Sequence, residues 1–320
     1  MRCRFRMLAA ALAVAAAMPA AAQGFPERAI TFVVPFGAGT ATDQLARALA
    51  PAITAETKQP VVVENRIGAS GMIAAQQVAK APPDGYTVLI STNTTHAANE
   101  HLYKKTGYDP VKDFAPITLL GKGVQMMLVA PGFPAKSVAE FVTMAKKEPG
   151  KLSFASGSSS SRMAGELLQQ LAGIDLLHVP YKSNTLAITD VIGGQVNAVI
   201  PDTATALPQV RSGKLRALAT TGSKRAPQAP DVPTVAEAGV PGYEMGYWFA
   251  AYAPAGTPAP VVKRLHELLT RAVASPQAKT FFDNSGVDPA TSTPEELARF
   301  QVAESQKWGR IIKAARIEPE

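Results

Sequence analysis

Cysteine is almost absent from this sequence of 320 residues: the only one is Cys3. Cys3 precedes an apolar N-terminal run that we expect to be cleaved off, so the mature chain has no thiol. This lack excludes disulfide bonds, thiolate metal sites and cysteine nucleophiles from the mature chain, and it fits an oxidising compartment. We expect the stability of the protein to come from packing alone.

Histidine is also scarce, with four residues that lie far apart in sequence: His96, His101, His178 and His266. No two of them have the His-x-x-x-His spacing of a helical zinc site, and we predict neither a metal nor a cofactor. The G-x-S-x-G turn of a serine nucleophile is missing as well. A hydrolase is therefore disfavoured, although the members of a catalytic triad do not have to be close in sequence.

Basic residues do not gather into a cluster or stripe. The chain has 32 Lys and Arg against 25 Asp and Glu, a net charge of +7, and removal of three N-terminal arginines lowers the charge to +4. Such a small and dispersed excess suits an anionic small molecule and disfavours nucleic acid as a partner.

The N-terminus has the pattern of a secretory signal peptide. Arginines occupy positions 2, 4 and 6, an apolar run covers Leu8–Met18, and small residues fill Ala20–Ala22. The apolar run is shorter than the roughly 20 residues that span a bilayer. We expect a signal peptide over residues 1–22, cleavage before Gln23, and a mature periplasmic protein that acts as a monomer.

Short hydrophobic runs alternate with helical patterns along the mature chain, which predicts an α/β fold with two mainly parallel sheets. The predicted strands are Ile30–Pro35, Val61–Glu64, Tyr86–Ser91, Ile117–Leu120, Gln125–Ala130, Leu152–Ala155, Leu176–Val179, Val196–Ile200, Leu215–Thr220 and Tyr247–Ala253. A hydroxyl, a proline and two acids over Ser292–Glu296 predict the start of a last helix that runs to about Ala315.

Two segments are candidates for passages between two lobes. Gly121–Gly123 separates two predicted strands, and the strand at Tyr247–Ala253 follows a proline-rich connection. Two crossings would build lobe 1 from residues 23–122 and 250–320 and lobe 2 from residues 123–249. Two lobes joined in this way can close about a hinge around a ligand.

The segment Val33–Asp43 combines a strand end, a glycine turn and a helix start. Glycines allow the backbone to approach a ligand, and the free N–H groups of a first helical turn favour an anion. We therefore expect a ligand loop at the following residues: Phe36, Gly37, Ala38, Gly39, Thr40 and Ala41. The alternative is that Thr40, Thr42 and Asp43 only cap the helix.

A run of serines has the same character in the middle of the chain. The residues in question are Ser156, Gly157, Ser158, Ser159 and Ser160, followed by Arg162. Taken alone, this run also fits a flexible linker. Because the glycine loop and this loop each open a helix, and fall in different lobes, closure would bring two positive helix ends onto one carboxylate. Arg162 is either a second charge contact or a solvated arginine on the helix face.

Three more polar loops follow predicted strands, over residues 91–96, 181–184 and 201–204. In parallel α/β sheets ligands bind beyond the carboxyl ends of the strands. Each loop also fits an ordinary turn.

From Phe25 onward, short motifs recur in a characteristic order. They are Phe25–Arg28 leading into Ile30–Phe36, Pro60–Arg66, Pro83–Thr87, Tyr108–Pro116, His178–Lys182, Gly193–Val196, Ser212–Leu218 and Asp231–Gly239. With these motifs the mature chain resembles the Bug-type extracytoplasmic solute receptors, the substrate-binding subunits of tripartite tricarboxylate transporters.

The resemblance implies a Venus-flytrap periplasmic-binding-protein fold and a membrane-embedded transporter as a possible partner. It also implies ligand contacts at Ser91 and His96 in one lobe, and at Tyr181 and Asp202 in the other, besides the glycine and serine loops. The chain departs from the family pattern within the ligand loops themselves: the first loop reads Gly37–Thr40, and Ser183–Asn184 follow the Tyr-Lys pair where glycines are common.

The resulting prediction is a solute-binding protein that captures a mono-, di- or tricarboxylate between its lobes for uptake or sensing. The alternative is an exported α/β enzyme that acts on a small organic acid. A dinucleotide enzyme is the nearest rival, since Gly37-x-Gly39 follows a strand and Glu64 ends the next one, but Thr42 takes the place of the third glycine.

Overall fold

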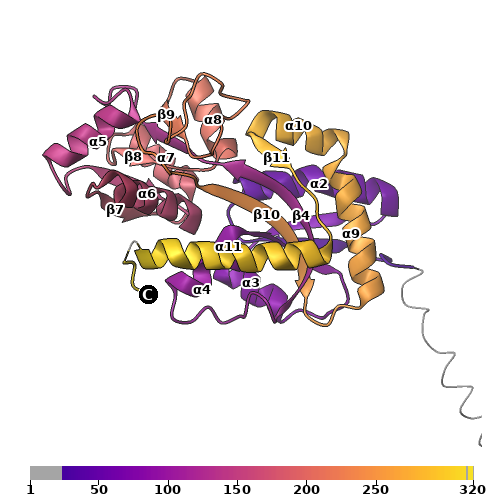
Figure 1. Ribbon diagram of the computed structural model, residues 1–320. Helices are drawn as coiled ribbons and strands as arrows, with labels where there is room; N and C mark the ends of the chain where they lie inside the picture. The colour runs from indigo at the N-terminus through magenta and orange to yellow at the C-terminus, as the bar shows by residue number, and fades with distance from the viewer. Residues whose placement is uncertain (1–23, 315, 320) are drawn as a thin grey trace, which may run out of the picture.

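The computed structural model describes residues 24–314 and 316–319, which form two groups of helices and strands around two β-sheets (Figure 1). The expected signal peptide, residues 1–22, lies outside the described residues and with it Cys3. Among the helices of the described part, none is long and apolar enough to cross a membrane.

The larger sheet has six strands in the order β11-β4-β10-β3-β1-β2. Its strands are β1 (Ile30–Val34), β2 (Val61–Asn65), β3 (Thr87–Thr92), β4 (Phe114–Val124), β10 (Gly246–Pro254) and β11 (Val287–Pro289). The helical segments around it are α2 (Ala41–Thr57), η2 (Ala69–Gly71), α3 (Met72–Ala79), the π-helical turn η3 (Thr94–Ala98), α4 (Asn99–Leu102), α9 (Ala259–Val273), α10 (Pro276–Ser285) and α11 (Pro294–Ala314).

The smaller sheet has five strands in the order β7-β6-β8-β5-β9. These are β5 (Met126–Val129), β6 (Ser153–Ser156), β7 (Leu177–Pro180), β8 (Ala198–Val199) and β9 (Arg216–Thr220). The helices of this lobe are α5 (Val138–Lys147), α6 (Ser159–Ala172), α7 (Asn184–Ile192) and α8 (Thr203–Arg211). The larger sheet thus draws strands from both ends of the described chain, and the smaller one only from the middle.

The two-lobed α/β fold is confirmed, but the expectation of mainly parallel sheets was wrong, because both sheets are mixed. β1 pairs in parallel with β2 and β3, and β6 with β7 and β8. In contrast, β10 is antiparallel to β3 and β4, β11 to β4, and β5 to β8 and β9. The reason is the crossing between lobes: a strand that enters or leaves a lobe runs against its neighbours.

β4 is longer than predicted and passes without a break through Gly121–Gly123, which we expected to separate two strands. Glycine is needed there for packing. A Cβ at Gly121 would lie 2.8 Å from Val287 Cγ1, and one at Gly123 would lie 2.4 Å from the Tyr247 ring. β4 and its antiparallel partner β10 are the long strands that run between the two groups of elements in Figure 1.

Alternation along β1 distributes its side chains between two hydrophobic cores. Ile30, Phe32 and Val34 pack with α2 and α9, whereas Val33 belongs to a core on the other face of the sheet. This second core continues into the smaller lobe, where it includes Phe154. A third core lies between the smaller sheet and helices α7 and α8. Each sheet is therefore covered by helices on both faces.

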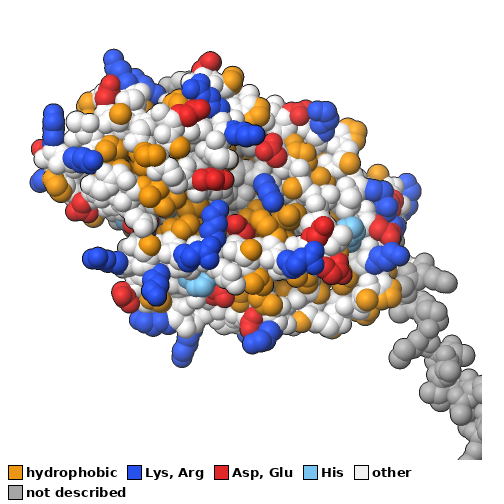
Figure 2. All heavy atoms as spheres, in the orientation of Figure 1, with side chains coloured by type: hydrophobic (Ala, Val, Ile, Leu, Met, Phe, Trp, Pro, Cys, Tyr) orange, Lys and Arg blue, Asp and Glu red, His pale blue; other side chains and the backbone are white. Residues whose placement is uncertain are grey.

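The last helix, α11, begins as the sequence predicts. Thr293 Oγ1 accepts a hydrogen bond from Glu296 N at 3.2 Å, and Glu296 Oε2 accepts one from Thr293 N at 2.9 Å. This reciprocal arrangement is a capping box. The helix lies across the larger sheet and also contacts α6 of the other lobe, so it connects the two lobes along the side seen in Figure 1, and Figure 2 shows the same face with all heavy atoms.

Candidate functional site

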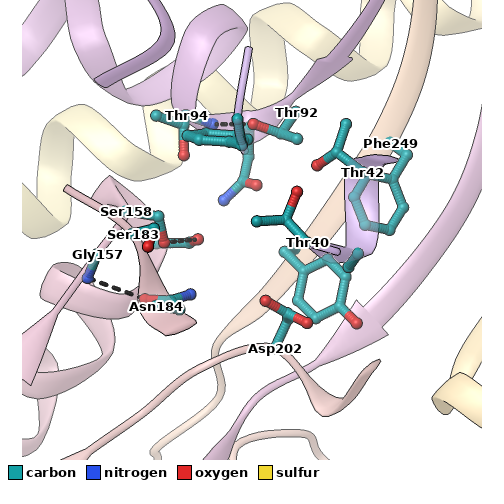
Figure 3. A pocket seen from close by; sticks show the side chains of 15 residues that line it. Thr40, Thr42, Thr92, Thr94, Gly157, Ser158, Ser183, Asn184, Asp202 and Phe249 are labelled. Atoms are coloured by element: carbon teal, nitrogen blue, oxygen red, sulfur yellow. Dashed lines mark hydrogen bonds between the residues drawn. The ribbon is translucent and has the colours of Figure 1, made fainter. Parts of the chain in front are cut away.

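A cavity lies between the lobes, where loops that follow strands of both sheets meet (Figure 3). We call it the inner cavity. It is lined by Phe36, Thr40, Ala41, Thr42, Thr92, Asn93, Thr94, Gly157, Ser158, Ser160, Ser183, Asn184, Asp202, Tyr247 and Phe249. The volume open to the centres of water-sized molecules is ≈ 40 Å³. Because one water needs about 10–15 Å³ by this measure, the cavity has room for a few waters or one small polar group.

The N-terminal caps of four helices line the inner cavity. They are Thr40 of α2, Ser158 of α6, Ser183 of α7 and Asp202 of α8. Figure 3 shows the four side chains around the same space. Each helix N-terminus carries free N–H groups and a partial positive charge. Four such ends on one cavity create a positive potential without any cationic side chain, and this potential favours an anion.

The four helix ends differ in how their first-turn amides are satisfied. Ser158, Ser183 and Asp202 each accept a hydrogen bond from the backbone N–H three residues further on. Thr40 does not cap α2 with its side chain. Its hydroxyl instead donates to Gly37 O at 2.7 Å. The first-turn amides of α2 are therefore the ones left open toward the cavity.

A buried carboxylate holds the glycine loop in shape. Asp43 Oδ2 accepts a hydrogen bond from Gly39 N at 2.9 Å, and Arg47 Nε donates to both carboxylate oxygens, at 3.0 and 3.1 Å. Asn65 Nδ2 donates to Asp43 Oδ1 and also to Phe36 O. Burial of Asp43 disfavours its charge, but these hydrogen bonds outweigh burial and lower its pKa. Asp43 thus holds the glycine loop from within: it accepts from Gly39 N, which precedes the helix, and Thr40 does not cap α2 with its side chain.

The serine loop is an ordered helix start, and the flexible-linker interpretation was wrong. Gly157 N donates to Asn184 Oδ1 at 2.9 Å, which ties this loop to α7. A Cβ at Gly157 would lie only 1.9 Å from the carbonyl carbon of Ser183, so this position requires glycine. Ser159 Oγ donates to Asn99 Oδ1 at 3.2 Å and links the two lobes beside the cavity.

The charge of the inner cavity is unusual for an anion site. None of the 15 described residues that line it is Lys, Arg or His, and one of them, Asp202, is acidic. Burial raises the pKa of Asp202, while hydrogen bonds from the Thr205 N–H and hydroxyl oppose this effect. Asp202 caps α8, so part of its charge is offset by that helix.

A second, larger cavity of ≈ 500 Å³ adjoins the first. We call it the outer cavity. It shares Phe36, Gly157 and Ser158 with the inner cavity and is otherwise lined by Pro35, Ile67, Gly68, Ala69, Ser70, Gly71, Leu102, Tyr103, Ser156, Ser159, Arg162, His178, Pro180, Tyr181 and Lys182.

Basic side chains distinguish the outer cavity from the inner one. Arg162 and Lys182 both line it. Arg162 Nε lies 3.7 Å from Glu166 Oε1, and burial raises the pKa of Glu166. Tyr181 donates its hydroxyl to an Asp190 oxygen at 2.6 Å, and this bond raises the Tyr181 pKa to about 12. Arg162 is thus placed at the cavity wall with 22% of its side chain exposed, and its role as a second charge contact stays a prediction.

Two residues expected to contact a ligand lie in the protein core instead. Ser91 and His96 are fully buried and line neither cavity. Ser91 Oγ lies 2.7 Å from His96 Nδ1, and the His96 ring stacks on Tyr252 with a centroid distance of 4.0 Å. Burial lowers the pKa of His96 to about 3, so its imidazole is neutral. The reason is local: Ser91 lies in β3 and bonds to His96, and the turn after β3 directs the His96 ring inward among Tyr108, Phe114 and Tyr252.

Most of the remaining predicted residues are brought together. The inner cavity takes in Phe36, Thr40, Ala41, Gly157, Ser158, Ser160 and Asp202. The outer cavity adds Ser156, Ser159, Arg162 and Tyr181. Gly37, Ala38 and Gly39 line neither cavity. The turn that they form, with Gly39 at φ +80°, sets the direction in which α2 begins.

Sequence reasoning left out several lining residues. Thr92, Asn93, Thr94, Ser183 and Asn184 fall in the polar loops at residues 91–96 and 181–184 that the strand-end rule indicated, but they were not singled out there as ligand contacts. Tyr247 and Phe249 lie in β10, a strand that reads only as hydrophobic, and no signal in the sequence points to them.

Among the described residues, no group of three or more His, Cys, Asp or Glu could hold a metal ion. A site built from helix ends, hydroxyls and amides suits the binding of an anion. In the described part, His178 is the one histidine at a cavity wall, and Ser156 Oγ lies 2.7 Å from its Nε2 at the end of a parallel strand pair.

Fold and site together define a class: a two-lobed binding protein with a cavity between its lobes that helix N-termini line. The chain belongs to the tripartite tricarboxylate transporter receptor family, whose model matches residues 45–317. Protein BugT of Bordetella pertussis is 34% identical over 93% of this chain and 92% of its own length.

Two solved structures are similar to this chain over nearly their whole length. Rpa4515 of R. palustris, solved with adipate, is 36% identical and superposes with a TM-score of 0.89 over 92% of this chain and 100% of its own. MatC of Rhodopseudomonas palustris, solved with bound malate, is 34% identical with a TM-score of 0.84 over 90% of this chain and 100% of its own.

Proposed function

We propose that this protein is a periplasmic receptor that closes on a small carboxylate and delivers it to a membrane transporter or a sensor. The observation that carries the proposal is the meeting of four helix N-termini on one cavity, with the first turn of α2 left uncapped. The ligand contacts that we propose are Asp202 and those residues of the glycine loop and the serine loop that line the inner cavity.

Helix ends suffice to bind such a ligand. A hydrogen bond to a charged group contributes roughly 1.5–3 kcal/mol. Three or four of them, less the cost of ordering the ligand, approach the ~8 kcal/mol of micromolar binding. A cationic side chain in the inner cavity is therefore not required, and neither is a cofactor.

The two adjoining cavities suit two parts of one ligand, its head carboxylate and the rest of the molecule. The inner cavity is small enough to hold one carboxylate, and the outer cavity offers ≈ 500 Å³ and two basic side chains, Arg162 and Lys182. We expect the head carboxylate in the inner cavity, and the longer part of the ligand or its second acidic group in the outer cavity. The adipate found with Rpa4515 and the malate bound to MatC support an organic acid of this kind.

Closure requires a hinge, and we place it in the crossing strands. The lobe boundaries that we expect, at residues 122/123 and 249/250, fall inside β4 and β10. The β4–β10 pairing shifts register between Phe249 and Ala250, at the second boundary. An irregular pair of strands bends more easily than a regular one. We expect the protein to act as a monomer without catalytic activity.

The proposal is tested by thermal shift of the protein without its signal peptide, against organic acids and the matching neutral amides. Organic acids that fit should raise the melting temperature, and their amides should not, because the helix ends stabilise charge. Equal shifts for acid and amide would contradict the proposal. Chemical analysis of the acid after incubation decides the enzyme alternative, since a receptor returns it unchanged.

A further inference from the structure

Asn93 is a buried amide without a partner at the wall of the inner cavity. It follows β3 directly and has 0% of its surface exposed. Neither its Nδ2 nor its Oδ1 makes a hydrogen bond within the described structure, although it lines the cavity. The two residues beside it are hydrogen-bonded to each other: Thr94 N donates to Thr92 Oγ1 at 3.2 Å.

An unpaired buried amide destabilises a folded protein, and such groups are rare in native structures. The side chain of Asn93 therefore needs a partner, and the cavity that it lines is where a partner can enter. Nδ2 is a donor and Oδ1 is an acceptor. A molecule that satisfies both atoms must present an acceptor and a donor side by side.

A plain carboxylate satisfies only half of this requirement. Its oxygens accept a hydrogen bond from Asn93 Nδ2, but an ionised carboxylate has no proton to donate. Asn93 Oδ1 is then left unpaired. Asp202 adds further acceptor oxygens to the same cavity. The inner cavity thus contains one acceptor, Asn93 Oδ1, that a ligand with only a carboxylate at its head would leave unsatisfied.

We propose that Asn93 is a specificity-determining residue that selects carboxylates with a hydroxyl or an amino group on the carbon next to the carboxyl group. Its Nδ2 donates to the carboxylate and its Oδ1 accepts from the neighbouring hydroxyl or ammonium. Asp202 favours the ammonium through its charge. This inference rests on the proposed function, because it assigns the chemistry of the ligand head in the same cavity.

The test is a set of titrations by calorimetry with matched acids: succinate, malate and aspartate, then glutarate, 2-hydroxyglutarate and glutamate. Within the set that fits best, at least one 2-substituted acid should bind about tenfold or more tightly than the plain acid, a difference of about 1.4 kcal/mol. Equal affinities would mean that water fills this role and would overturn the inference while leaving the proposed function intact. Absence of binding by every acid would overturn both.

Asn93→Leu and its control Gln125→Met test whether the preference for 2-substituted acids depends on Asn93. Asn93→Leu has a similar shape without the amide, and the preference for the 2-substituted acid should disappear; an unchanged preference would refute the role of Asn93. Gln125→Met is the matched control, because Gln125 is also a buried amide with an unpartnered oxygen but lines neither cavity. The ratio of affinities of this control should equal that of the unmodified protein.

Asp202→Asn should weaken the binding of 2-amino acids more than that of 2-hydroxy acids, and equal losses of affinity would refute the role of the Asp202 charge.

Discussion

Removal of a single backbone N–H at the start of α2 should weaken ligand binding without unfolding the protein. Ala41 is the first residue of this helix and lines the inner cavity. Proline is tolerated at the first position of a helix, because the N–H there has no partner within the helix. The preceding Thr40 has φ −72° and ψ 159°, the extended conformation that a following proline requires. Ala41→Pro therefore removes one donor and keeps the helix.

The expected loss follows from the kind of bond removed. A hydrogen bond between an amide and a carboxylate contributes roughly 1.5–3 kcal/mol. Since about 1.4 kcal/mol corresponds to a factor of ten, the dissociation constant should rise about ten- to a hundredfold. Isothermal titration with the best ligand of the thermal-shift screen measures this change, and a thermal melt without ligand checks the fold.

Val138→Pro is the matched control for this experiment. Val138 is also a buried first residue of a helix, α5, and its N-cap Ser137 is extended, with φ −142° and ψ 163°. It lines neither of the two cavities. Ligand affinity should stay unchanged in this variant. If Ala41→Pro binds as tightly as Val138→Pro, the first turn of α2 does not hold the ligand, and the reasoning from open helix amides fails.

Two further predictions concern stability. Gly157→Ala should lower the melting temperature and abolish binding, because its Cβ would lie 1.9 Å from the Ser183 backbone and overpacking of this kind costs about 1–3 kcal/mol. Gly132→Ala is the control, since a Cβ there meets no atom within 4 Å and the melting temperature should not change. Equal melting temperatures of the two variants would contradict the packing argument. His96, whose pKa burial lowers from 6.5 to about 3, stays neutral in the folded protein while the unfolded chain binds a proton, so the free energy of unfolding should fall by about 1.4 kcal/mol per pH unit as pH drops below about 6.5. Denaturant titrations at several pH values should show a shallower fall for His96→Gln, and an equal fall would assign the effect to other groups.

The positions of the secondary-structure elements could be predicted because their signals are local. Each of the ten predicted hydrophobic runs contains or overlaps a strand, and the capping residues at Thr293 and Glu296 correctly mark the start of α11. β11 was missed because a strand of three residues is too short to show a period. Mixed pairing was missed because the direction of a strand depends on where its partner comes from, and a hydrophobic run carries no direction.

The candidate site divides along the same line. The amino-acid sequence by itself determined which segments begin helices with open amides, since glycine, serine and threonine at a strand end suffice for that. It did not determine which side chains of a polar loop face the cavity: at the end of β3 and in the turn that follows, Asn93 lines the cavity, whereas Ser91 and His96 line neither cavity and bond to each other. Only the tertiary structure decided that, and only it brought Tyr247 from the returning strand β10 to the same wall. The physical reason is that the cavity is formed by segments far apart in the chain, and the packing of the two lobes, rather than any local preference, sets which atoms meet there.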